Sequence, residues 1–190
     1  MKIIILLLLL VSFETSASED FSIEEHFTKP VKIPAPISTY LNKEMREDIA
    51  LCEGVKPEDM FEVKTIHLNK SSKTYLVKPA STCLCGVYYC PMWIFQMKHN
   101  TAHLIWDVSG TGFLEVLNKK TNGFKQLKEL GGAAMHGHMS IWSWDGKKYI
   151  EIHRQLYSRN NAKNCFDIET FHLKNGKLIR ATNKCLDELP

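Results

Sequence analysis

From Phe61 onward the chain alternates apolar and polar residues in short runs that turn-forming residues separate. A period of two places successive side chains on opposite faces and therefore predicts β-strands. Asn122-Gly123, Asp145-Gly146 and Asn175-Gly176 suit two-residue hairpin loops. The runs should therefore form an antiparallel meander rather than βαβ units. The expected hairpins pair residues 61–68 with 73–79, 91–100 with 101–108, 112–120 with 124–130, 139–144 with 147–157, and the two halves of 165–185.

One segment before these runs has helical periodicity instead. Ser38, Thr39 or Asn42 can cap the start of a helix, and Gly54 follows as a stop. The predicted fold is α+β, an antiparallel β-sheet meander with one packed N-terminal helix. The apolar residues that share one face of this helix are Leu41, Met45, Ile49 and Cys52.

The amino-terminal residues have the pattern of a cleaved signal peptide: one lysine, an apolar run from Ile3 to Val11, and small residues at Thr15, Ala17 and Ser18, with cleavage expected after Ala17. The run is about half of the roughly 20 residues that a membrane-spanning helix needs. We expect residues 1–17 to be the signal peptide, 18–37 an extended arm with three prolines, and 38–190 a single domain. The protein should thus be periplasmic or secreted, with no membrane insertion after cleavage.

The formal net charge of +3 is spread along the chain and gives no reason to expect a nucleic-acid partner. Six cysteines in an exported chain predict three disulfides. Cys165 and Cys185 lie equally far from Asn175 and should face each other across a hairpin. Cys85–Cys90 can close a small loop, which leaves Cys52 for Cys83. Zinc binding by Cys83, Cys85 and Cys90 is the alternative, but their spacing matches no zinc pattern.

The run "KTYLVKPASTCLCGVYYCPMWIFQ" resembles the Ivy-type periplasmic inhibitors of vertebrate lysozyme, in which a strand leads into a disulfide-closed Cys-x4-Cys loop. In that family the loop projects from an antiparallel sheet into the lysozyme cleft. The resemblance implies that Gly86, Val87, Tyr88 and Tyr89 form a partner-binding loop. The family places a histidine in this loop, and this chain has none between Cys85 and Cys90.

A longer stretch, residues 93–127 together with "WSWDGKKY", is similar to a type of small exported bacterial protein of unknown function. Its shared features are W-x-F, TNG(F/Y)-x-x-L and (F/W)DGK-x-Y. This resemblance implies export and carries little information about activity.

The segment "MHGHM" holds the candidate metal ligands Met135, His136, His138 and Met139. Imidazole and thioether groups suit copper or zinc, and in an extended chain the two histidines share a face. The neighbouring glycines Gly131, Gly132 and Gly137 indicate a loop up to His138, which would leave no fixed face. We therefore predict no metal and no cofactor, and keep a His/Met-dependent metal-binding protein as an alternative.

A second polar cluster is "YIEIHRQLY", where a regular strand would put Tyr149, Glu151 and His153 on one face. A carboxylate beside a histidine can act as an acid–base pair, so a small secreted hydrolase is another alternative. "DVSGTGFLE" has the outline of a calcium loop but only two carboxylates, Asp107 and Glu115, and is interpreted as a turn.

No complete catalytic motif is present in the sequence, and two adjacent tyrosines in a short disulfide-closed loop make good anchors for a partner. The sequence therefore favours a non-enzymatic exported binding protein with a protein partner. Its specific form would be an inhibitor or immunity-type protein that acts on an extracytoplasmic enzyme.

Overall fold

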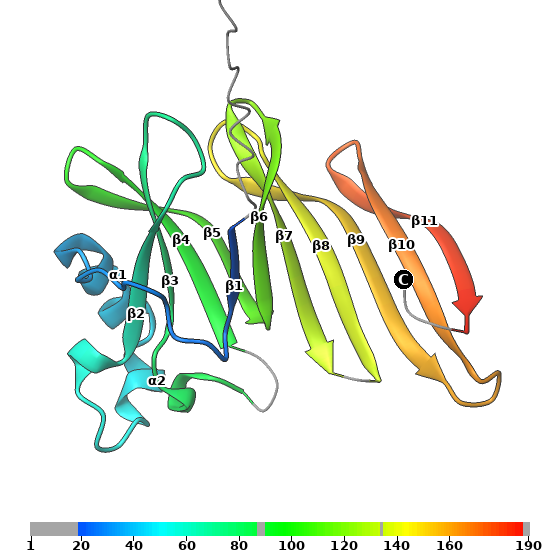
Figure 1. Cartoon of the computed structure of the whole chain (residues 1–190), viewed down its shortest axis with the longest axis horizontal. Coiled ribbons are helices and arrows are strands. Elements are labelled where there is room, and N and C mark those ends of the chain that lie inside the picture. Colours follow the sequence, from blue (N-terminus) through cyan, green and yellow to red (C-terminus); the bar gives the residue numbers. More distant parts are fainter. Residues whose placement is uncertain (1–18, 87–89, 134, 188–190) are drawn as a thin grey trace, which may run out of the picture.

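The computed structural model describes residues 19–86, 90–133 and 135–187, and the expected signal peptide lies outside them (Figure 1). Its strands form two antiparallel sheets, as the alternating pattern predicts. Sheet A has seven strands in the order β1-β6-β7-β8-β9-β10-β11, and sheet B has four in the order β2-β3-β4-β5. The strands of sheet A are β1 (Glu19–Ser22), β6 (Phe113–Thr121), β7 (Phe124–Ala133), β8 (His136–Trp144), β9 (Tyr149–Asn160), β10 (Cys165–Lys174) and β11 (Lys177–Leu186). Those of sheet B are β2 (Phe61–Ile66), β3 (Lys73–Pro79), β4 (Cys90–Lys98) and β5 (Thr101–Thr111).

Two of the predicted hairpin turns are confirmed in detail. Asn122-Gly123 has φ values of 50° and 82°, and Asn175-Gly176 has φ values of 52° and 73°. Two successive residues with positive φ match the right-handed twist of the flanking strands. The loop at Asp145-Gly146 is different: Trp144 pairs with Tyr149, so four residues connect the strands. The Asp145 carboxylate accepts the backbone N–H groups of Lys147 and Lys148 and stabilises this longer loop.

The predicted helix is present but begins earlier than expected and breaks once. Helix α1 spans Ala35–Glu44 and helix α2 spans Arg46–Ala50. Pro36 lies in the first turn, where its fixed φ favours a helix start, so Ser38, Thr39 and Asn42 are interior residues and not caps.

Sheet B lies between α1 and sheet A. Ile37 and Leu41 of α1 are fully buried against one face of sheet B, in a cluster with Tyr75, Val77 and Phe95. The residues that alternate with these point the other way and pack on sheet A. This second and larger cluster includes Leu76, Ile94 and Trp106 of sheet B and Leu114, Leu127, Trp144 and Tyr149 of sheet A. We call the face of sheet A that meets sheet B its inner face.

The amino-terminal arm packs against both sheets. β1 pairs with β6, and the buried Lys78 ammonium donates to the carbonyls of Ser22, Ile23 and Glu25, the last at 2.5 Å. The three expected disulfides are all present, Cys52–Cys83, Cys85–Cys90 and Cys165–Cys185, with Cα–Cα separations of 5.5, 4.3 and 5.6 Å. None of the helices in the described residues is long and apolar enough to cross a membrane.

Candidate functional site

Sheet A extends well beyond sheet B, and its inner face changes character where the cover ends. Figure 1 shows β9, β10 and β11 continuing to the right of the smaller sheet. There the inner face carries a hollow of about 310 Å³ between sheet A and the end of β5. A second hollow, of about 440 Å³, shares His138 and Leu156 with the first and continues over Asp167 and Glu169 of β10 to Asn183 of β11. We call these two hollows together the groove. The first is lined by Val108, Ser109, Gly110, Glu129, His138, Ser140, Trp142, Arg154 and Leu156.

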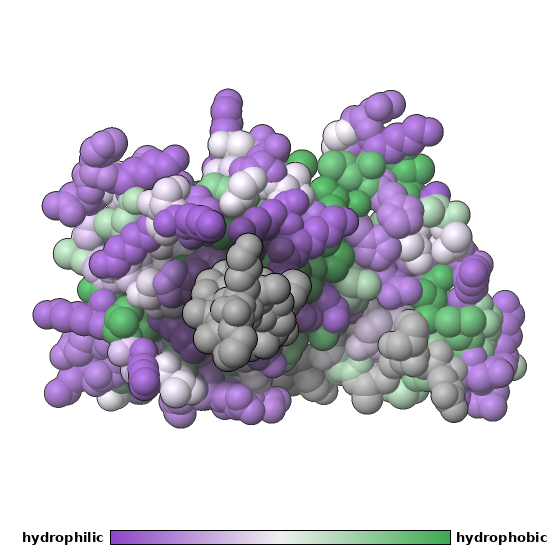
Figure 2. Space-filling model, turned by 45° about the horizontal axis from the view of Figure 1, so that its top comes forward, coloured by the Kyte–Doolittle hydropathy of each residue, from purple (hydrophilic) through white to green (hydrophobic). Residues whose placement is uncertain are grey.

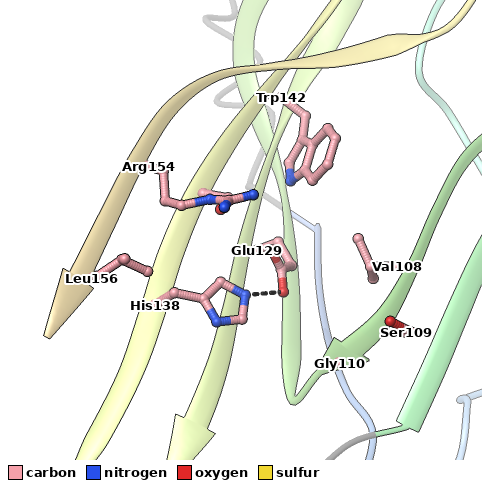
Figure 3. A pocket seen from close by; sticks show the side chains of 9 residues that line it. Val108, Ser109, Gly110, Glu129, His138, Trp142, Arg154 and Leu156 are labelled. Carbon is pink, nitrogen blue, oxygen red and sulfur yellow. Dashed lines mark hydrogen bonds and ion pairs between the residues drawn. The ribbon is translucent and has the colours of Figure 1, made fainter. Parts of the chain in front are cut away.

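The floor of the groove holds a buried carboxylate. Glu129 is only 2% exposed, and its Oε1 lies 2.8 Å from Nε2 of His138, which is 27% exposed (Figure 3). A carboxylate this deeply buried is costly unless it is paired. The pair therefore fixes the orientation of the His138 ring at the surface of the groove.

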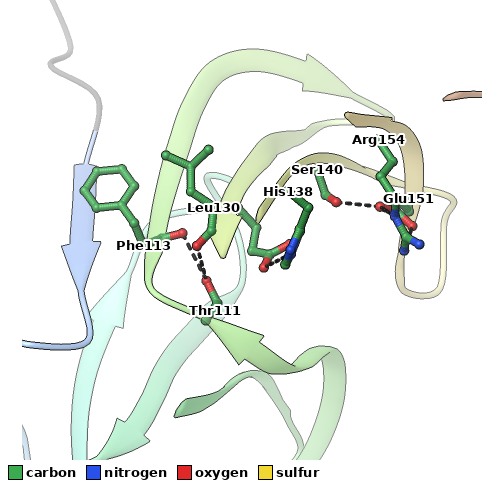
Figure 4. A network of polar contacts seen from close by, with 8 residues as sticks. Thr111, Phe113, Leu130, His138, Ser140, Glu151 and Arg154 are labelled. Atoms are coloured by element: carbon green, nitrogen blue, oxygen red, sulfur yellow. Dashed lines mark hydrogen bonds and ion pairs between the residues drawn. The ribbon is translucent and has the colours of Figure 1, made fainter. Parts of the chain in front are cut away.

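A second polar network lies beside this pair (Figure 4). Glu151 accepts a 2.5 Å hydrogen bond from the Ser140 hydroxyl and two bonds from Arg154, at 2.7 Å from Nε and 2.5 Å from a terminal nitrogen. Two-point contact between guanidinium and carboxylate is the strong geometry for such a pair. Arg154 stays 41% exposed, so it is held in place and still accessible.

One donor at the groove has no partner. The indole nitrogen of Trp142 is buried and makes no hydrogen bond in the described part of the chain. Its ring meets the Trp106 ring edge to face at 6.1 Å, and Figure 3 shows the nitrogen directed into the hollow. A buried N–H without an acceptor costs about 1–3 kcal/mol. Neighbouring atoms cover this nitrogen, so an acceptor would recover that free energy once a small side-chain movement let it come within hydrogen-bond distance.

The glycines near His138 serve close packing rather than a loop, so the expectation of a loop up to His138 is wrong. β7 runs to Ala133 and β8 begins at His136. A Cβ on Gly131 would lie 2.4 Å from both the His138 ring and the Gly110 carbonyl. A Cβ on Gly137 would lie 2.3 Å from the Tyr157 hydroxyl. Glycine within a strand marks such an approach of another group.

The four candidate metal ligands of "MHGHM" do not lie on one face of β8. His136 and His138 share the inner face, as an extended chain requires, whereas Met139 alternates with them and points to the outer face. Met135 precedes the strand, and its carbonyl accepts the N–H of Arg159. The structure does not bring the four side chains together.

Among the described residues, one group of three or more metal-ligand side chains lies close together, Cys165, Asp167 and Cys185. Its two cysteines form a disulfide with each other. They therefore offer no thiolate, which is the form that binds a metal.

Glu151 and His153 do not form the acid–base pair on which the alternative of a small hydrolase depends. The pairing of β8 with β9 shifts register between Ile141 and Trp142, because Ile141 faces His153 whereas Trp142 faces Glu151. The extra residue in β9 turns His153 to the outer face while Glu151 stays on the inner face. Tyr149 is buried in the core, where it donates to the Lys125 carbonyl.

The expected partner-binding loop is described only at its base. The Cys85–Cys90 disulfide and the exposed Gly86 are in place, whereas Val87, Tyr88 and Tyr89 lie outside the described residues. Gly86 lines a third hollow, of about 320 Å³, whose wall at Val108 and Ser109 also borders the groove. The base of the loop and the groove are therefore neighbours.

The groove itself could not be identified from the sequence, because each of its residues also suits an ordinary solvent-exposed sheet face. Figure 2 shows that the surface seen in that view is mainly hydrophilic, with hydrophobic patches toward the side of β10 and β11. The one usable signal is the cluster of strand glycines, which marks close approach. No protein-family model, curated protein or solved structure matches the chain significantly.

Proposed function

We propose that this chain is a non-enzymatic binding protein of the extracytoplasmic space, and that it takes a protein partner in the groove. An extracytoplasmic enzyme that the chain inhibits would be such a partner. Export is supported by the signal-peptide pattern and by three disulfides, which persist in oxidising compartments. The observation that carries the proposal is the buried, unpartnered indole N–H of Trp142 at a groove in which His138 and Arg154 are already held in place.

Fixed side chains favour tight binding because a partner need not order them. His138 is oriented by Glu129, and Arg154 by Glu151. Ordering one flexible side chain at an interface costs about 0.5–1.5 kcal/mol. Exposed Leu156 lies opposite His138 and two residues along β9 from Arg154, where it offers an apolar contact.

The shape of the groove favours a macromolecule over a small ligand. Small-molecule sites enclose most of their ligand's surface. This groove is bounded on one side by the end of β5 and runs openly across β8 and β9 to Asn183 on β11. A protuberance of a protein surface suits such a shape, and the nearby loop at Gly86 would add a second contact.

The polar contacts favour binding over acyl transfer. A nucleophilic serine needs a histidine within hydrogen-bond reach. In the described residues Ser140 donates to Glu151, and His138 contacts Glu129. Ser140 and His138 therefore contact different carboxylates.

The test is a binding assay of the mature protein against a panel of purified lysozymes and cell-envelope hydrolases. Leu156→Arg places a bulky charge in the groove, and Ile179→Arg is its matched control. Ile179 is also an exposed apolar residue, but its pairing with His172 puts it on the outer face. We expect Leu156→Arg to weaken binding at least tenfold, about 1.4 kcal/mol, and Ile179→Arg to have no effect. Equal binding by both variants, or no binding to any panel member, would contradict the proposal.

The loop is tested in the same assay. Tyr88→Ala combined with Tyr89→Ala should weaken partner binding by about 2 kcal/mol if one ring is an anchor. If only Leu156→Arg weakens binding, the groove alone forms the interface.

A further inference from the structure

Two histidines face each other on the outer face of sheet A, away from the groove. His153 of β9 and His172 of β10 are directly opposite in the strand register. The row continues with Ile141 of β8 on one side and Ile179 of β11 on the other. Beyond Ile141 the row reaches the ion pair of Lys128 and Glu115, and the two imidazoles are flanked directly by apolar side chains.

The imidazoles are oriented with matching nitrogens toward each other. Their Nδ1 atoms are 3.1 Å apart, and the ring planes are tilted by 39° with centroids 4.8 Å apart. Two imidazole nitrogens bound at about 2.0–2.1 Å lie about 2.9 Å apart in adjacent positions of a square-planar copper(II) site and about 3.3 Å apart in a tetrahedral site. Only a small adjustment of the side chains would place both nitrogens at ligand distance.

The surroundings of His153 also favour its neutral form. The pKa of His153 is lowered by its partial burial and by the neighbouring His172, and the Glu151 carboxylate acts in the opposite direction. A neutral imidazole is the form that ligates a metal. Glu151 itself is bound to Ser140 and Arg154 on the inner face and is not available as a third ligand.

We propose that His153 and His172 form a two-histidine site for a divalent transition metal ion, with copper(II) preferred. The strands hold both ligands in place, so little side-chain entropy is lost on binding. Two ligands leave the remaining coordination positions open to water, which makes the site exchangeable. Imidazole suits copper, nickel and zinc, and copper(II) heads the usual affinity order.

The experiment is titration of the untagged mature protein with copper(II), followed by calorimetry and by electron paramagnetic resonance. His153→Ala and His172→Ala each remove one ligand. Both side chains are at least partly exposed, so these variants should fold, which circular dichroism would verify. The control is His136→Ala, which removes an exposed inner-face histidine of β8.

We expect one copper ion per chain with two nitrogen ligands in the spectrum. Each single variant should bind at least tenfold more weakly and show one nitrogen fewer, whereas the control variant should keep the wild-type spectrum. Copper binding that survives both single variants, or that is lost only in the control, would overturn the proposal. Absence of copper binding in the wild type would show that the pair is a simple imidazole–imidazole hydrogen bond.

Discussion

The inner face of sheet A has two halves, one covered by sheet B and one uncovered. The same strands contribute residues to both. Under sheet B the inner face presents Leu127 and Trp144, both buried in the large apolar cluster. A few residues further along the same strands it presents Glu129 and His138. The covered half stabilises the fold by removing apolar surface from water, and the uncovered half is free to carry polar groups. One sheet can therefore supply both the core and a binding surface when its partner sheet is shorter.

The largest effect expected from this comparison is on stability. Leu127→Ala in the covered half should lower the free energy of unfolding by about 2–5 kcal/mol, because it leaves a cavity in a close-packed core. Leu156→Ala in the uncovered half should change it by no more than about 0.5 kcal/mol. Urea denaturation followed by circular dichroism measures both. Similar losses for the two variants would remove the distinction between the halves.

The second prediction concerns Glu129, which begins the uncovered half of the inner face. His138→Ala leaves Glu129 buried without its partner and should destabilise the protein by about 3 kcal/mol. Adding Glu129→Leu removes the unpaired charge and should restore much of that loss. The same denaturation experiment gives both values. A double variant less stable than His138→Ala alone would contradict the idea that His138 offsets the cost of burying the Glu129 carboxylate.

The disulfides should differ in their contributions according to the chain they enclose. Replacing Cys52 and Cys83 by alanine opens the longest loop, with a separation of 31 residues, against 20 for Cys165–Cys185 and 5 for Cys85–Cys90. Loop-closure entropy gives losses of about 3.7, 3.3 and 2.1 kcal/mol in that order. Thermal unfolding of the three double variants would show the ranking. A greater loss for Cys85–Cys90 than for Cys52–Cys83 would mean that the small loop stabilises the fold through its contacts.

The smallest expected effect is a pH dependence on the outer face. The pKa of His153 is lowered in the folded state by burial and by His172. The unfolded chain therefore binds the proton more readily, so this contribution to stability is complete above the unfolded pKa of about 6.5 and is lost as the pH falls below it. His172→Gln removes one cause of the shift. The loss of stability between pH 7.5 and pH 5 should be smaller in this variant than in the wild type.

The sequence predicted the strands, the helix face and all three disulfides because these depend on local signals. Asn122-Gly123 and Asn175-Gly176 adopt positive φ at low cost, and the second turn brings Cys165 near Cys185. The start of α1 was missed because Pro36 outweighs the later capping residues.

The candidate site depends on features that no local pattern reveals. The register shift between Ile141 and Trp142 turns His153 away from Glu151 and brings it to His172 on the next strand. Gly131 resembles a loop residue in the sequence, and only the packed structure shows the His138 ring against it. A bulge and a close approach both arise from contacts between strands distant in sequence, so the groove and the histidine pair could not be predicted.

The central claim, that a partner enters the groove, is tested most directly by the indole N–H signals of the protein in a nuclear magnetic resonance titration. The chain has four tryptophans, and Trp142→Phe assigns the signal of interest. On addition of a partner from the binding assay, the Trp142 signal should shift strongly as its unpartnered N–H meets an acceptor, while that of the buried Trp144 should stay in place. A Trp142 signal that remains unchanged at saturating partner concentration would contradict the account.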